Sequence, residues 1–170
     1  MKPALAILAM LCCAAAHAQD NTSIKFLRVT GMTYIKEGDQ ILLTLRAGAP
    51  LPPAPSDSLD MAVADGRAEL EAAGMDISAS AGTEFSVSVS SSGAAEMSDI
   101  LSTDPLQVKT KPGNIILLTQ GTTVAVAPGG PVTVKSGKAL FTFMSTGETK
   151  ALGAGNSICE LETSQESHTK

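Results

Sequence analysis

The chain has 170 residues, with 12 basic and 17 acidic side chains and no tryptophan. Its charges are interspersed and form no basic patch, which argues against nucleic acid and anionic lipid as partners, because phosphate contacts need clustered lysine and arginine. The aromatic side chains are too few for a surface on which sugars or bases stack, and we expect them in the core. They are Phe26, Tyr34, Phe85, Phe141 and Phe143.

Residues 1–18 have the three parts of a cleavable secretory signal. Lys2 supplies the positive charge, and residues 4–13 form an uncharged, largely aliphatic run. This run is well short of the roughly 20 residues that a transmembrane helix needs. Ala16-His17-Ala18 is a cleavage site of small residues. The mature protein is therefore expected in the periplasm or outside the cell.

Cleavage after Ala18 predicts that N-terminal mass spectrometry of the exported protein finds Gln19 as its first residue. The alternative is lipidation at Cys12 or Cys13, which a diacylglyceryl group on either residue would reveal. Leu11 stands where a lipoprotein signal usually has a small residue, so we expect no lipid anchor. No later run of the chain is apolar for long enough to span a membrane.

Short strand patterns, separated by glycine, proline, asparagine and aspartate, follow along the mature chain. The clearest pattern is at residues 85–90, where Phe85, Val87 and Val89 alternate with serines and predict a strand with one buried face. The run Ile115–Leu118 is apolar throughout and is typical of a strand buried on both faces. Residues 93–101 are interpreted as a short helix or a linker. The other expected strands are 24–29, 33–36, 41–45, 76–81, 124–126, 132–134 and 139–143.

Residues 59–73 allow two interpretations. They are rich in alanine, leucine and glutamate, which favour a helix. However, Leu59, Met61 and Val63 alternate with other residues before Asp65-Gly66, and a second alternating run follows. Asp-Gly between two alternating runs indicates a β-hairpin, because a type I′ turn needs positive φ at both positions. We therefore predict a hairpin, with a helix as the alternative.

These patterns predict an all-β fold, either a sandwich or rolled antiparallel sheets, with at most one short helix. The domain is expected over residues 19–162, followed by a disordered tail at 163–170. A hairpin turn, a strand and a glycine stop occur at Gly38–Gly48 and again at Gly147–Gly155. This repeat raises the alternative of two related lobes, 24–90 and 105–162.

The order of short motifs over residues 24–162 resembles the periplasmic FecR-like β-domain family. The motifs are Val29-Thr30-Gly31, Leu45-Arg46-Ala47-Gly48, residues 59–70 around Asp65-Gly66, Gly82-Thr83-Glu84-Phe85-Ser86-Val87, Val132–Gly137 and Leu152–Ile158. The resemblance concerns the exported module only, because the chain shows no anti-sigma or transmembrane segment. It implies an exported β-rich module, while the signalling role of members that have the anti-sigma and transmembrane parts does not carry over.

Catalytic chemistry finds little support in the sequence. The mature chain has one histidine, His168, which lies in the tail, and a serine or cysteine nucleophile needs a base held beside it. The pairs Asp57/Asp60 and Asp99/Asp104 lie in no recognisable calcium loop, and zinc needs clustered histidine and cysteine. We therefore expect no catalytic, cofactor-binding or metal-ligating residue, no cofactor and no enzymatic activity.

One cysteine remains after cleavage, Cys159, so the mature chain cannot form an internal disulfide. We predict that Cys159 is buried beside Ile158 and Leu161, with an exposed thiol able to dimerise as the alternative.

The sequence thus predicts a non-enzymatic extracytoplasmic module that mediates protein–protein contact in envelope sensing or assembly, with an envelope protein as partner. The first alternative is a surface or structural protein that self-associates through its sheet edges into oligomers. The second alternative is a polysaccharide-binding domain.

Overall fold

The computed structural model describes residues 23–159, and these residues form strands and turns with no helix. The all-β prediction is therefore confirmed. The fifteen strands are β1 (Ile24–Val29), β2 (Met32–Glu37), β3 (Gln40–Arg46), β4 (Ser58–Asp65), β5 (Arg67–Ala72), β6 (Met75–Ser80), β7 (Thr83–Val89), β8 (Ala95–Leu101), β9 (Leu106–Lys109), β10 (Ile115–Leu118), β11 (Thr123–Val126), β12 (Pro131–Ser136), β13 (Lys138–Thr142), β14 (Thr149–Gly153) and β15 (Ser157–Cys159).

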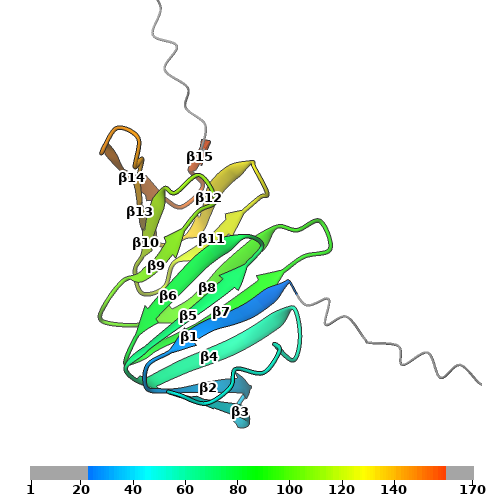
Figure 1. Cartoon of the computed structure of the whole chain (residues 1–170). Coiled ribbons are helices and arrows are strands. Elements are labelled where there is room, and N and C mark those ends of the chain that lie inside the picture. The colour runs from blue at the N-terminus through cyan, green and yellow to red at the C-terminus, as the bar shows by residue number, and fades with distance from the viewer. Residues whose placement is uncertain (1–22, 160–170) are drawn as a thin grey trace, which may run out of the picture.

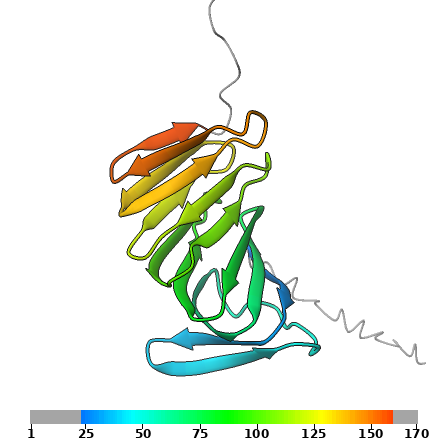
Figure 2. The same cartoon turned by 90° about the vertical axis from the view of Figure 1, so that its left-hand side faces the viewer.

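The strands form two antiparallel sheets that pack face to face (Figure 1). Sheet A has the order β1-β5-β6-β9-β10-β13-β14, and sheet B has the order β15-β12-β11-β8-β7-β4-β2-β3. From β5 onward the chain makes a hairpin in one sheet and then crosses to the other. Each crossing advances along the sandwich, so the colour in Figure 2 runs from one end of the molecule to the other. Both sheets therefore continue through residues 24–90 and 105–159.

The core lies between the sheets, where every second side chain of most strands points inward. Phe85, Val87 and Val89 are buried, and the serines between them face outward, as predicted. Deeper along the sandwich, the Phe141 and Phe143 rings meet edge to face with centroids 4.8 Å apart. The buried apolar residues form one connected cluster across both halves of the chain.

Residues 59–73 form neither a helix nor a hairpin, so both interpretations of this segment are wrong. Asp65-Gly66 separates two strands as predicted, but β4 belongs to sheet B and β5 to sheet A. In a sandwich, a hairpin and a crossing between sheets give the same alternation of inward and outward residues. The alternation therefore identified the strands and not the sheet to which each belongs.

The crossings pack backbone against backbone at two corners, and each corner depends on glycine. At the first corner, a Cβ on Gly66 would lie 2.8 Å from the Gly31 nitrogen. At the second, a Cβ on Gly137 would lie 2.7 Å from the Thr122 Cα. At each corner a threonine hydroxyl accepts a hydrogen bond from the backbone N–H of the residue after the glycine. The Arg67 N–H donates to Thr30 Oγ1, and the Lys138 N–H donates to Thr122 Oγ1. The corners thus share one construction in both halves of the molecule.

Three further expectations need correction. Residues 95–101 form strand β8, not a helix or a linker, because Ala95 and Met97 alternate inward against the core. Ile115–Leu118 is buried on one face only: Ile116 and Leu118 point inward, and the other two side chains point outward. Cys159 is exposed, because Ile158 takes the inward position of β15. The signal region 1–18 and the tail 163–170 lie outside the described residues.

Candidate functional site

Residues 23–159 contain no cluster of metal-ligating side chains. No group of three or more histidine, cysteine, aspartate or glutamate side chains in this range could hold a metal ion. His17 and His168 lie outside the range. Cys159, on the last strand of sheet B, is a free thiol. The candidate functional sites described below lie on the surfaces of the sandwich.

The outward face of sheet A carries an apolar patch over β10, β13 and β14, which we call the β10–β13 patch. Leu117 lies opposite Leu140, and Leu140 lies opposite Ala151 on the next strand. Ile115, one outward position along β10, extends the row. Leu140 is 42% exposed, while Ile115 and Leu117 are half-buried. The solvent-exposed face of an antiparallel sheet is usually polar, whereas this part of sheet A is apolar.

Polar and charged side chains surround the β10–β13 patch. Lys138 precedes Leu140 by two residues and shares its face, and Lys109 lies opposite Ile115. Asp76 lies opposite Lys109 on its other side. Thr142 and Thr149 share a hydroxyl hydrogen bond of 3.0 Å at the far edge. An apolar centre with a polar rim is the composition expected of a protein-binding surface.

Strand β3 forms a second apolar feature, at the opposite end of the molecule. It is the last strand of sheet B, and the β2–β3 hairpin lies at the end of the sandwich (Figure 2). Ile41 is 55% exposed and Leu42 is 51% exposed. The ladder with β2 shifts register between Ile35 and Lys36, which leaves Leu42 as an extra residue in β3. Exposed apolar side chains of β3 therefore lie on both faces of sheet B, with Leu42 on one face and Ile41 on the other.

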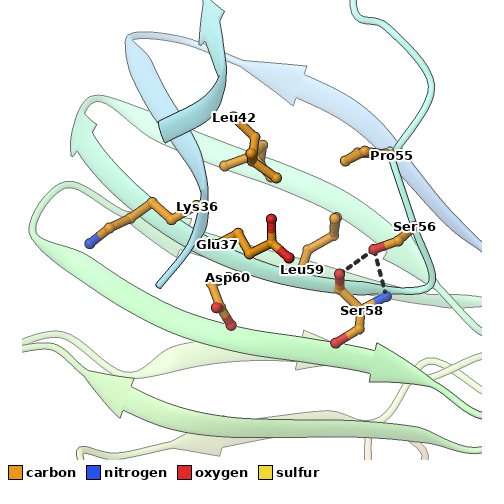
Figure 3. A pocket seen from close by; sticks show the side chains of 9 residues that line it. Lys36, Glu37, Leu42, Pro55, Ser56, Ser58, Leu59 and Asp60 are labelled. Carbon is orange, nitrogen blue, oxygen red and sulfur yellow. Dashed lines mark hydrogen bonds between the residues drawn. The ribbon is translucent and has the colours of Figure 1, made fainter. Parts of the chain in front are cut away.

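Leu42 lies over a hollow between the hairpin and the start of β4 (Figure 3). The hollow has a volume of about 390 Å³, and Leu59 and the Glu37 carboxylate also line it. Its far wall is the end of loop 47–57, where the Ser58 N–H donates to Ser56 Oγ at 3.2 Å. Lys36 points away from the hollow and forms an ion pair with Glu84, at 3.1 Å between Nζ and Oε2. The hollow is therefore part apolar and part acidic.

The sequence analysis predicts strands at these two surfaces but names none of their residues as a functional site. A signal was present in both cases, since 41–43 and 115–118 are runs of consecutive apolar residues in strands. Such a run places apolar side chains on both faces of a strand, while the described residues cover only one face of each sheet. In the described part of the chain, no helix is long and apolar enough to cross a membrane.

The described residues thus form a two-sheet β-sandwich with exposed apolar side chains at both ends. Comparison with known proteins adds no relative: no protein-family model matches the chain, and neither does any curated protein or solved structure.

Proposed function

We propose that this protein is a non-enzymatic module of the bacterial envelope that binds another protein through the β10–β13 patch. The observation that carries the proposal is the outward row of Leu117, Leu140 and Ala151 on a sheet face that nothing in residues 23–159 covers. Single exposed apolar residues are common on protein surfaces, whereas a contiguous apolar patch with a polar rim is typical of an interaction site.

Export of the protein is part of the same proposal. The signal pattern at residues 1–18 and the resemblance of residues 24–162 to the exported FecR-like module both support a site outside the cytoplasm. In the FecR-like family, the β-domain acts by contact with other envelope proteins. A contact surface without catalytic groups is what such a role requires.

Polysaccharide binding has less support from the surface. Sugar subsites commonly use exposed aromatic rings, and none of the large exposed apolar side chains among the described residues is aromatic. Two of the aromatic rings, Phe141 and Phe143, lie in the core against each other. Protein contact, which aliphatic side chains serve well, is therefore the better proposal.

Leu140→Ser tests the proposal. Removing the exposed leucine should weaken partner binding by about tenfold or more, because burying a leucine contributes about 1.5–3 kcal/mol. The measurement is recovery of envelope proteins with the mature protein as bait, by quantitative mass spectrometry. Thermal melts should show the two proteins equally stable, because Leu140 is not part of the core.

The matched control is Leu101→Ser, which removes a leucine of 55% exposure at the end of β8, away from the patch. Partner recovery should be unchanged in this variant. Equal recovery by Leu140→Ser and the unmodified protein would rule out the β10–β13 patch as the binding surface.

A further inference from the structure

We propose that two copies of this chain associate through strand β3, with the two β3 strands pairing antiparallel about a two-fold axis. The pairing would join the two copies of sheet B, each of eight strands, into one continuous sheet. This interface lies in sheet B at the other end of the molecule from the β10–β13 patch. It therefore stands independently of the partner contact proposed above.

Among the described residues, the two sheets have four edge strands, β1, β14, β15 and β3. These strands differ in the features that disfavour pairing with a further strand. Edge strands are commonly protected by charged residues or by being short. On β1, Lys25 and Arg28 are exposed, and β15 has three residues within the described range 23–159. On β14, Lys150 lies within the strand, and Gly153 ends it. These three edges carry the features that oppose pairing.

Strand β3 is the least protected edge. It has seven residues, the longest of the four edge strands, and its one charged residue, Arg46, is at its end. Its exposed half carries Ile41 and Leu42, and neither lysine nor proline interrupts it. Unpaired backbone N–H and C=O groups beside apolar side chains form a ready template for another strand. This edge is therefore the one from which assembly is expected.

Charge makes a second copy the fitting occupant. Glu37 and Asp39 lie at the turn where β3 begins, and Arg46 ends it. Antiparallel pairing of two β3 strands brings the acidic end of each beside the Arg46 of the other, so the contact forms twice. Glu37, Asp39 and Arg46 make no ion pair within the described residues, whereas the nearby Lys36 is paired with Glu84.

The geometry at Leu42 also suits a symmetric contact. The extra residue in β3 directs Leu42 over the hollow on the inward side, while Ile41 shares the outward hollow with Tyr34 and Lys36. A second copy placed against the edge can therefore cover apolar side chains on both faces of the sheet. Two-fold contacts of this kind are the commonest arrangement in oligomers.

The first experiment is sedimentation velocity of the mature protein over a range of micromolar concentrations. We expect a reversible monomer–dimer equilibrium. Ile41→Lys and Leu42→Lys should each raise the dimer dissociation constant by about tenfold or more, because each places a charge at the two-fold contact. The control Leu101→Lys, which changes an exposed leucine away from the edge, should leave it unchanged. A protein that stays monomeric throughout would overturn the proposal.

Cross-linking distinguishes the symmetric pairing from a head-to-tail one. With Cys159 replaced by serine, a cysteine at Leu42 should link only to the same residue of the second copy through a short thiol-reactive linker, because Leu42 lies near the two-fold axis when Asp39 of one β3 lies beside Arg46 of the other. With Cys159 retained, a link between residues 42 and 159 would show that β3 pairs with β15 of the next copy. That link, without a 42–42 link, would overturn the two-fold arrangement.

Discussion

Val87→Asp is expected to unfold the domain. Val87 is 1% exposed and lies in β7, between Leu59 of β4 and Met97 of β8, which are also buried. An aspartate there would lose the apolar burial of valine, about 1.5–3 kcal/mol, and would place an unpaired carboxylate in the core at a further cost of several kcal/mol. The sum is comparable with the total stability of a typical domain, about 5–15 kcal/mol. Circular dichroism during thermal unfolding measures the effect.

Ser88→Asp is the control for this experiment, because it places the same side chain on the outward face of the same strand. Ser88 lies opposite Ser58 and Glu96. The expected cost in unfolding free energy is about 1 kcal/mol or less and comes from repulsion between the new carboxylate and Glu96. If both variants lost stability equally, the assignment of inward and outward faces in β7 would be wrong.

Gly66→Ala should destabilise the domain far more than Gly38→Ala. Both glycines have positive φ, 70° and 58°, so both alanines incur a similar backbone strain of about 1–2 kcal/mol. At Gly66 the new Cβ would also lie 2.8 Å from the Gly31 nitrogen and from the Thr30 carbonyl carbon. At Gly38 it would meet no atom within 4 Å. The forced separation of the two crossings should add about 1–3 kcal/mol.

Urea unfolding of the two variants measures this difference directly, because the shared strain cancels in the comparison. A lower denaturation midpoint for Gly66→Ala than for Gly38→Ala is the expected result. Equal midpoints would mean that the first corner tolerates separation of the two crossings. The close contact of Gly31 with Gly66 would then not be needed for stability.

The strands could be predicted from the sequence because local physics determines them. Alternation at 85–90 identified the buried face of β7, and glycine at the turns marked where strands end. The assignment of strands to sheets was not local. The corner at Gly66 depends on contact with Gly31, which is 35 positions earlier in the chain. No pattern within residues 59–73 records that contact.

The candidate surfaces could not be predicted from the sequence, because their exposure also depends on contacts that are distant along the chain. The apolar run at 115–118 was interpreted as a strand covered on both faces, which is its usual meaning. Within residues 23–159 no layer covers the outward side of sheet A, so Ile115 and Leu117 remain partly exposed. Which face of a sheet a second layer covers is a property of the whole fold. The same reasoning explains Cys159, whose exposure depends on Ile158 pointing into the core.

Photo-cross-linking in living cells tests the proposed function most directly. A photoreactive amino acid would replace Leu140 on the outward face of sheet A in one strain and Ala125 on the outward face of sheet B in another. The proposed function predicts that the Leu140 position forms a discrete cross-link to an envelope protein and that the Ala125 position does not. Cross-links from Ala125 alone, or from neither position while the protein is exported and folded, would contradict binding through the β10–β13 patch.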